Sequence, residues 1–231
     1  EGGAKLLLCA RREDRLQALA TELKEKYGTE IYTFALDVRA QSQVEQAFSH
    51  LPAAWQSIDI LVNNAGLSSG LDLVHEADVE DWEVMIDTNI KGLLYVTRAV
   101  SPGMVERNSG HIINLGSIAG REAYRGGSVY CATKHAVRAF THAFRMDLLA
   151  HGVRVSSIDP GFVETEFSLV RFKGDKARAA QVYRGMTPLT SDDIADAVYY
   201  AATRPAHVNV SEILIMPTDQ ASITQINRRQ E

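Results

Sequence analysis

The amino-acid sequence predicts an α/β fold, with a doubly wound parallel sheet and helices on both faces. Short apolar runs alternate with longer amphipathic segments, as expected of repeated βαβ units. The prominent polar residues directly follow the apolar runs, at the edge where open α/β sheets bind ligands. A chain of 231 residues with 45% hydrophobic content can bury an ample core, and its length suits one large domain.

The expected elements alternate along the chain. Apolar runs bounded by polar or turn residues predict strands buried on both faces. These runs are residues 6–9, 31–36, 58–62, 112–115, 153–158 and 213–216. Amphipathic periodicity predicts a first helix that ends at Gly28, followed by helices over 82–106, 129–150 and 192–203. The long irregular stretch 162–188 predicts a functional loop or lid.

Composition excludes several classes of function. A net charge of -5 and a pI near 5.8 leave no broad positive surface, so we expect no nucleic-acid partner. No apolar run approaches the roughly 20 residues that span a bilayer. Cys9 and Cys131 fall in a predicted strand and a predicted helix and do not form a disulfide framework. We therefore expect a soluble cytoplasmic protein without a membrane partner.

The pair Tyr130 and Lys134, with Ser117 thirteen residues upstream of the tyrosine, suits carbonyl chemistry. Residues four apart share one face of a helix. A neighbouring ammonium lowers the pKa of a phenol, which favours a group that exchanges protons near neutral pH. One such pair is weak evidence, because the spacing also occurs by chance.

Other polar residues follow the predicted strands and would gather in the same crevice. They are Arg11, Arg12, Asp37, Asn63, Asn64 and the pair Pro160-Gly161. A structural interpretation competes for each one. Two arginines at a helix start can simply be solvated, Asp37 can be an N-cap, Ser117 can cap a strand end, and Tyr130 can be an aromatic residue on a helix face.

The sequence resembles the short-chain dehydrogenase/reductase family in Asn63-Asn64-Ala65-Gly66, Asn89, Ser117, Tyr130 with Lys134, and Pro160-Gly161. Within that family it is most similar to the NADP-dependent 3-hydroxy acid dehydrogenases. Segments 85–89, 110–114, 165–168, 170–172 and 207–209 carry this closer resemblance. The resemblance covers nearly the whole chain and implies one NADP-binding Rossmann-type domain over residues 1–231.

The resemblance implies a role for each matching residue. Tyr130 would be the acid/base, Ser117 would hydrogen-bond the substrate oxygen, Lys134 would also hold the nicotinamide ribose, and Asn89 would anchor a water molecule. Tyr130 and Lys134 would belong to the cofactor site as well. The other implied cofactor residues are Arg11 and Arg12 for the 2′-phosphate, Asp37 and Val38 for the adenine, Asn64, Ala65 and Gly66 for close backbone approach, and Pro160, Gly161, Val163 and Thr165 around the nicotinamide.

The resemblance implies a small 3-hydroxy acid substrate, such as L-serine or 3-hydroxypropionate, and its 3-oxo acid or semialdehyde. A substrate carboxylate needs a cation, and the candidates are Arg121, Arg125 and Arg171, the last in a lid over 162–172. Alternatives are a reductase of other small aldehydes or ketones, including sulfonated ones, and a non-catalytic NADP-binding sensor or subunit. The family's long helices, here 82–106 and 129–150, imply a homodimer or homotetramer.

One part of the family pattern is missing from the sequence. The family opens with a strand and a glycine-rich turn that binds the pyrophosphate, whereas this chain begins just before the second strand. We expect the domain to be N-terminally incomplete and the native polypeptide to carry about 20 to 30 residues upstream. His111, His135 and His142 lack the partners and spacing of a metal site, so no metal is expected.

Overall fold

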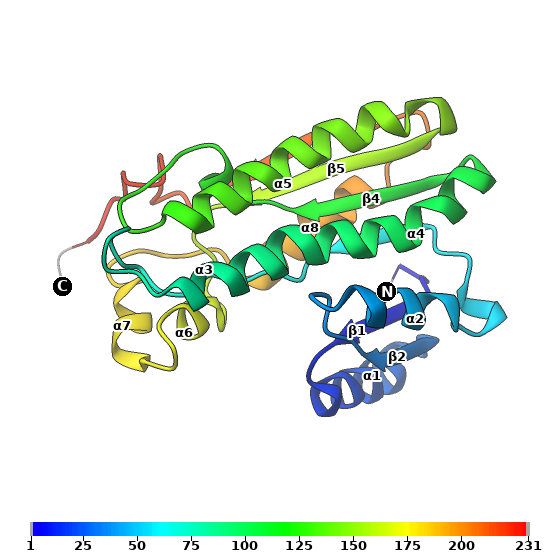
Figure 1. The fold of residues 1–231 in the computed structure, drawn as a ribbon, viewed down its shortest axis with the longest axis horizontal. Helices are drawn as coiled ribbons and strands as arrows, with labels where there is room; N and C mark the ends of the chain where they lie inside the picture. Colours follow the sequence, from blue (N-terminus) through cyan, green and yellow to red (C-terminus); the bar gives the residue numbers. More distant parts are fainter. Residues whose placement is uncertain (1, 230–231) are drawn as a thin grey trace.

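The computed structural model describes residues 2–229 and has the predicted α/β architecture (Figure 1). All strand pairs are parallel. The strands are β1 (Leu6–Ala10), β2 (Ile31–Ala35), β3 (Ile60–Asn63), β4 (Gly110–Leu115), β5 (Val153–Pro160) and β6 (Glu212–Ile215). The helices are α1 (Glu13–Tyr27), α2 (Gln41–Ser49), α3 (Val79–Ile86), α4 (Leu93–Arg107), α5 (Ser128–Asp147), α6 (Phe167–Arg171), α7 (Lys176–Gln181) and α8 (Ser191–Ala202).

Helices cover both faces of the four-stranded part of the sheet. On one face, α4 contributes Val96 and Met104 to a buried cluster with Ile112 of β4. On the other, α8 packs Ala201 against Ile158 of β5. This two-sided cover confirms the doubly wound arrangement, and it explains why most residues of β4 and β5 are buried.

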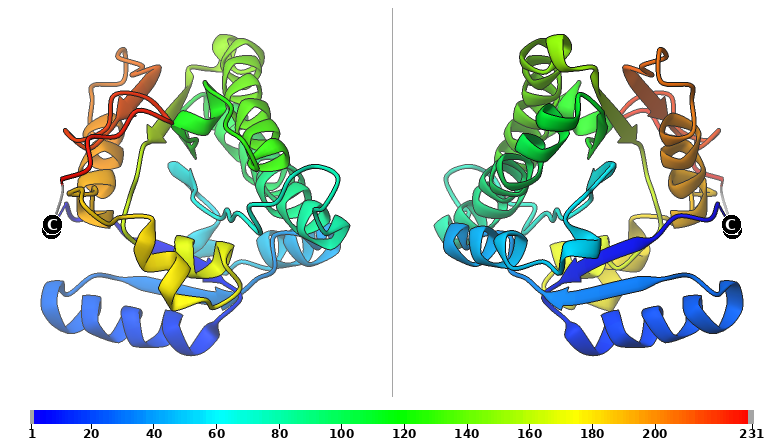
Figure 2. Two further views of the ribbon diagram at one scale, coloured as in Figure 1. Left: turned by 90° about the vertical axis from the view of Figure 1, so that its left-hand side faces the viewer. Right: turned by 90° about the vertical axis from the view of Figure 1, so that its right-hand side faces the viewer.

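The sheet consists of two parts, β1-β2 and β3-β4-β5-β6, and β1 does not pair with β3. Figure 2 shows the β1–α1–β2 unit along one side of the molecule. The prediction of burial on both faces is wrong for four strands, because β1, β2 and β6 contain no fully buried residue and β3 is buried on one face only. Leu61 of β3 is buried, whereas Ile60 and Val62 are 43% and 41% exposed, because they point to the face opposite α4. Cys9 of β1 is also exposed.

The helix boundaries follow local signals. Gly28 ends α1 with a φ of 65°, a left-handed conformation that glycine adopts without strain. Thr190 and Asp193 form a reciprocal capping box at the start of α8. The helix predicted over 82–106 is continuous but changes its hydrogen-bond pattern, because a π-helical turn, η2 (Asp87–Gly92), joins α3 to α4.

The stretch predicted as irregular over 162–188 contains α6 and α7. Its first part is attached to the body, since the carbonyl of Arg171 accepts a hydrogen bond from Gly70 N at 2.9 Å and Lys173 Nζ lies 2.9 Å from Asp81 Oδ2. We call residues 162–181 the lid. Within residues 2–229, no helix combines the length and apolar character needed to cross a membrane.

Candidate active site

Ser117 and Tyr130 meet at the carboxyl end of β4. Ser117 follows the strand closely and precedes a 3-10 turn, η3 (Ile118–Gly120), and its Oγ accepts a hydrogen bond from Ala119 N at 3.1 Å. Tyr130, in the first turns of α5, is 8% exposed and its side chain is hydrogen-bonded to Ser117. Ser117 is therefore a local cap and a partner of the phenol at once, so its role as a cap does not compete with its predicted role in catalysis.

Lys134 lies one turn further along α5. Its Nζ donates to the backbone oxygen of Leu115 at 2.8 Å. Burial lowers the pKa of Lys134 to about 8, and the charge of Asp159 opposes this effect. A lysine with this pKa is only partly charged at slightly alkaline pH, which suits a residue of a proton-transfer site.

Tyr130 is under opposing influences. Burial raises its pKa, while the hydrogen bond from Ser117 and the charge of Arg171 lower it. The Arg171 guanidinium, on the lid, lies 5.2 Å from the centre of the Tyr130 ring. The cation that lowers the pKa of the phenol in this structure is thus Arg171, and the predicted effect of Lys134 is not among the causes.

Asn89 lies in the π-helical turn η2 and is 2% exposed. Its side chain exchanges hydrogen bonds with the backbone of Leu67 at 2.8 and 2.9 Å and donates to Thr133 Oγ1 at 3.1 Å. A Cβ on Gly66 would lie 3.4 Å from Asn89 Oδ1 and 3.6 Å from Lys134 Nζ. The structure therefore brings the predicted residues Gly66, Asn89 and Lys134 together, and π-helical turns are frequent at functional sites.

The predicted adenine-binding residues lie beyond β2. Arg39 Nη2 lies 2.6 Å from Asp37 Oδ2, and the hydrogen bonds from Arg39 lower the pKa of Asp37. The alternative interpretation of Asp37 as an N-cap is wrong, because the residue before α2 is Ala40. Val38 packs on Gly92 of η2, where a Cβ would lie 2.6 Å from Val38 Cγ2.

Two arginines converge on one carboxylate at the end of β1. Arg12 Nη2 and Arg15 Nη1 lie 3.2 and 2.9 Å from Glu166 Oε2. Arg11 is exposed nearby in sequence. Arg15 was not among the residues predicted from the sequence, although its position three residues after Arg12 at a helix start places both on one face. A pair of guanidinium groups that already binds an anion fits the 2′-phosphate of NADP.

The remaining predicted cofactor residues surround the same crevice. Asn64, Ala65 and Gly66 follow β3 and are exposed, which fits close approach of a cofactor to the backbone. Pro160 ends β5, and a Cβ on Gly161 would lie 2.2 Å from Gln220 Oε1.

In two lid residues, the atoms predicted to contact the nicotinamide already accept hydrogen bonds from nearby residues. The carbonyl of Val163 accepts a hydrogen bond from the Tyr183 hydroxyl at 2.8 Å, and Thr165 Oγ1 accepts one from Phe167 N at 3.2 Å. Their predicted contacts with the nicotinamide remain predictions.

The three substrate arginines have different surroundings. Arg171 donates to Ser68 Oγ at 3.0 Å and to the Tyr124 hydroxyl at 2.7 Å, beside Tyr130. Arg121 is paired with the carboxylates of Asp159 and Glu212, so its guanidinium is already neutralised and its candidacy for the substrate is not supported. Arg125 is exposed.

A pocket opens next to Tyr130 and Arg171's partner Ser68. It is lined by Ser68, Ser69, Gly70, Asp72, Ala77, Asp81, Trp82, Met85, Gly126, Gly127, Ser128, Val129 and Tyr130. Because Tyr130 is among its lining residues, it is the candidate substrate pocket. No group of three metal-ligating side chains occurs within the described residues.

The parallel α/β fold, together with the arrangement of Ser117, Tyr130 and Lys134, is typical of a nucleotide-dependent enzyme that acts on carbonyl groups. Sequence comparison agrees, since the short chain dehydrogenase family profile matches residues 1–175. This chain belongs to the short-chain dehydrogenase family, and it is an oxidoreductase acting on CH–OH groups.

Individual relatives are closely similar. The chain is 54% identical over 222 residues to an NADP-dependent 3-hydroxy acid dehydrogenase, YdfG, of Salmonella typhi, covering 96% of this chain and 88% of that protein. It is 46% identical over 222 residues to sulfoacetaldehyde reductase 2 of Chromohalobacter salexigens, covering 96% and 87%. A solved structure of serine dehydrogenase in its closed form with NADP+ superposes with a TM-score of 0.91 at 51% identity, covering 99% and 91%.

Proposed function

We propose that this chain is an NADP-dependent dehydrogenase that interconverts a small 3-hydroxy acid, such as L-serine or 3-hydroxypropionate, and its 3-oxo acid or semialdehyde. The observation that carries the proposal is the Arg171 guanidinium, held 5.2 Å from the ring of Tyr130. A 3-hydroxy acid has its carboxylate two bonds from the reacting carbon. A cation beside the acid/base can therefore bind the carboxylate while Tyr130 meets the reacting oxygen.

The cofactor is NADP, as in the relatives named for it. Arg11, Arg12 and Arg15 would hold the 2′-phosphate, and Asp37 and Val38 the adenine. Backbone groups of Asn64, Ala65 and Gly66 would approach the cofactor, as would Pro160, Gly161, Val163 and Thr165 near the nicotinamide. When bound, NADP supplies or accepts the hydride.

The acid/base chemistry belongs to three side chains. Burial raises the pKa of Tyr130, which keeps the phenol protonated and able to donate a proton to the substrate oxygen during reduction. Ser117 Oγ donates a hydrogen bond to the same oxygen and stabilises the negative charge that develops there. Lys134, one helical turn after Tyr130, would bind the nicotinamide ribose. A water molecule held by Asn89 would link its ammonium to solvent.

Arg171 is the substrate residue that the site supports. Its planar fork can bind a carboxylate through two parallel hydrogen bonds. Ser68 and Tyr124 hold the guanidinium in place, at 3.0 and 2.7 Å, so little side-chain entropy is lost on binding. Arg121 and Arg125 lack this combination of nearness to Tyr130 and fixed orientation.

The whole chain, residues 1–231, would act as a single domain in the cytoplasm and as a homodimer or homotetramer. Apolar side chains at and just after the end of α5 support association, since Met146 in its last turn and Leu149 in the following 3-10 turn are 71% and 75% exposed. Scattered exposed apolar residues are normal, but two large ones at one helix end favour contact with another subunit.

A sulfonated aldehyde is the second candidate substrate. A sulfonate carries the same charge as a carboxylate and would bind the same guanidinium. The 46% identity to sulfoacetaldehyde reductase 2 supports this candidate.

The test is a comparison of cofactors and substrates with the full-length polypeptide. Formation of reduced cofactor would be followed by absorbance with 3-hydroxypropionate, L-serine or 2-hydroxyethanesulfonate, each with NADP or NAD. 1-Propanol is the uncharged control. We expect kcat/KM to be highest with NADP and a 3-hydroxy acid. Equal rates with 1-propanol would contradict the carboxylate assignment, and a higher rate with the sulfonate would favour the second candidate.

A further inference from the structure

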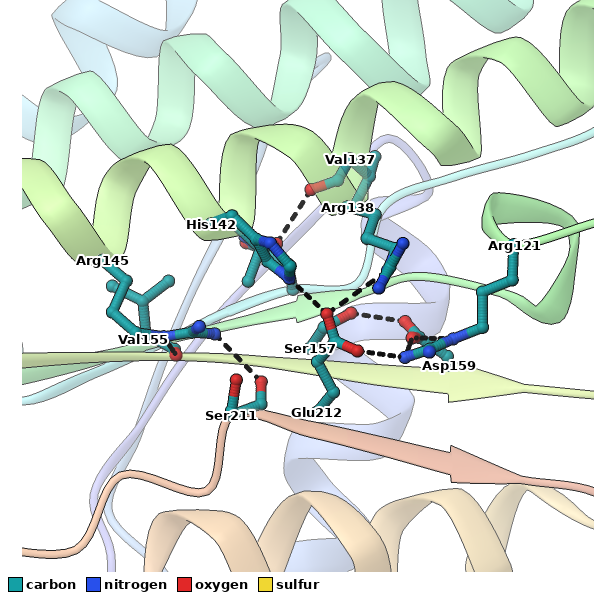
Figure 3. Close-up of polar contacts among 12 residues, drawn as sticks. Arg121, Val137, Arg138, His142, Arg145, Val155, Ser157, Asp159, Ser211 and Glu212 are labelled. Carbon is teal, nitrogen blue, oxygen red and sulfur yellow. Dashed lines mark hydrogen bonds and ion pairs between the residues drawn. The ribbon is translucent and has the colours of Figure 1, made fainter.

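A network of ion pairs joins Arg121, which follows η3, to side chains of α5, β5 and β6 (Figure 3). At its inner end, the side chain of Asp159 is 1% exposed. Asp159 Oδ2 accepts hydrogen bonds from Arg121 Nε at 2.9 Å and Nη2 at 2.5 Å, and Ser157 donates to the other oxygen. A buried carboxylate is costly unless it is paired and hydrogen-bonded, so Asp159 depends on Arg121.

Asp159 contacts both ends of the loop that carries Ser117. At the start, Gly116 packs so closely that a Cβ there would lie 2.0 Å from Asp159 Oδ1, and no other residue type fits that position without displacing the carboxylate. At the end, Arg121 directly follows η3 and forms the ion pair. Both ends of the loop 116–121 therefore contact the buried carboxylate of Asp159, and Ser117 lies between these two ends.

The outer end of the network attaches the same loop to α5. Glu212, the first residue of β6, accepts hydrogen bonds from Arg121 Nη2 at 2.5 Å and from Arg138 Nε at 3.3 Å, and it also bonds with His142. Burial would raise the pKa of Glu212, but its bonds to His142 and Arg121 lower it to about 2. Arg138 follows Lys134 by one helical turn, and Glu212 contacts this helix through His142 as well, so Arg138 is not its only link to α5.

We propose that Asp159 and Arg121 are positioning residues, which hold the loop 116–121 where the Ser117 hydroxyl meets Tyr130. The inference rests on the proposed roles of Ser117 and Tyr130. Both side chains must reach the reacting oxygen at hydrogen-bond distance. A displacement of about 1 Å in such a site can cost about 100-fold in rate, so a loop fixed at both ends has a direct kinetic consequence.

The carboxylate of Asp159 has a second effect, on Lys134. Its charge opposes the lowering of the Lys134 pKa by burial. The charged and titratable groups of the network that holds Asp159 are Arg121 from the loop, Glu212 from β6, and Arg138 and His142 from α5. Removal of the anion would let Lys134 lose its proton at lower pH, an effect that a merely structural residue would not produce.

The experiment uses the variants Asp159→Asn, Arg121→Gln, Arg121→Lys and the double variant D159N/R121Q. Arg138→Gln is the matched control, because it removes a cation from the outer end and leaves Arg121 paired with both carboxylates. Tyr130→Phe is the benchmark for the chemistry. The measurements are kcat and KM with 3-hydroxypropionate and NADP, the Kd for NADPH from fluorescence, the Tm, and the dependence of kcat on pH.

We expect D159N and R121Q to lose about 10- to 100-fold in kcat with an unchanged Kd for NADPH. The double variant should lose no more than either single one, because the pair acts as a unit. R121K should recover part of the rate, and D159N should move the alkaline limb of the pH profile to lower pH. R138Q should change kcat by less than about threefold.

Other results would overturn the inference. Unchanged kcat in D159N and R121Q, additive losses in the double variant, or losses that simply follow Tm and NADPH binding would each reject a positioning role. The proposed function is tested separately by the benchmark. Full activity of Y130F rejects the proposed function, whereas an inactive Y130F together with a fully active D159N rejects only the role of the network.

Discussion

The ion pairs at the two ends of the site differ in exposure. Asp159 and Arg121, at the loop of Ser117, have 1% and 24% of their side-chain surface exposed, whereas Glu166 and Arg12, at the phosphate end, have 52% and 60% exposed. An exposed ion pair contributes little and exchanges partners easily, so Arg12 can leave Glu166 for a phosphate. A buried carboxylate that loses its partner is left uncompensated. The buried pair thus holds the geometry beside Ser117 fixed, whereas the exposed pair leaves Arg12 able to exchange Glu166 for a cofactor phosphate.

The largest expected effect is a loss of kcat when Tyr130, the proposed acid/base, is changed. Tyr130→Phe removes the acid/base hydroxyl and should lower kcat by about 10²- to 10⁴-fold, with the Kd for NADPH unchanged. Steady-state kinetics and a fluorescence titration measure the two quantities. Tyr27→Phe is the control, because Tyr27 is 38% exposed and remote from the site. Turnover that survives in Y130F would indicate a cofactor-binding sensor.

The buried lysine provides the next test, through stability. The unfolded chain keeps the Lys134 proton up to the ordinary lysine pKa of 10.5, whereas the folded chain loses it near pH 8. Between these values the unfolded state binds more protons, so stability rises with pH there. Since one pKa unit is worth about 1.4 kcal/mol, the cost at neutral pH is on the order of 3 kcal/mol.

Lys134→Met removes this cost together with the activity. We expect the variant to be more stable than the wild type at pH 7, with a difference that narrows toward pH 10, as measured by urea unfolding at several pH values. Lys24→Met, at an exposed position of α1, should show no such trend. A constant difference across the pH range would mean that Lys134 is not desolvated.

A test of the lid follows. Arg171→Ala should raise KM for 3-hydroxypropionate by about 10- to 100-fold, as expected for loss of a charged hydrogen bond, and should affect 1-propanol much less. Arg125→Ala should leave both KM values nearly unchanged. Equal effects of Arg171→Ala on the acid and the alcohol would reject it as the carboxylate ligand.

The smallest effect is expected at the exposed phosphate end. Arg12→Ala should weaken NADP binding by about 10-fold and leave NAD binding unchanged, because only NADP carries the 2′-phosphate. The loss should shrink at high salt, which screens exposed charges. Calorimetric titrations at two salt concentrations measure it, with Arg98→Ala as the exposed control. Equal weakening of NAD would place Arg12 elsewhere.

The proximity of Ser117, Tyr130 and Lys134 could be predicted from the sequence because it depends on their spacing. Tyr130 and Lys134 share a helix face by periodicity alone, and Ser117 follows an apolar run that predicts a strand. The fate of the arginines could not be predicted. Arg121 and Arg171 have identical side chains, and their surroundings depend on Asp159, Glu212 and Tyr124, which come close only in the folded chain.

Two features of the fold also lie beyond sequence patterns. The exposure of β3 is not visible in the apolar runs, because Ile60 and Val62 resemble core residues whether or not a helix covers them. The lid helices α6 and α7 are only five and six residues long, too short to show a periodic pattern.

Because of the π-helical turn η2, the continuous helix formed by α3 and α4 packs against two different hydrophobic clusters. One extra residue in a turn rotates everything beyond it by about 100° relative to an uninterrupted α-helix. Before the turn, Met85 packs in the cluster with Tyr130; after it, Val96 and Met104 pack in the main core beneath β4. The turn thus rotates the apolar face of the helix between the two clusters. Deletion of one residue from the turn would point the apolar side chains of either the active-site cluster or the main core away from their partners.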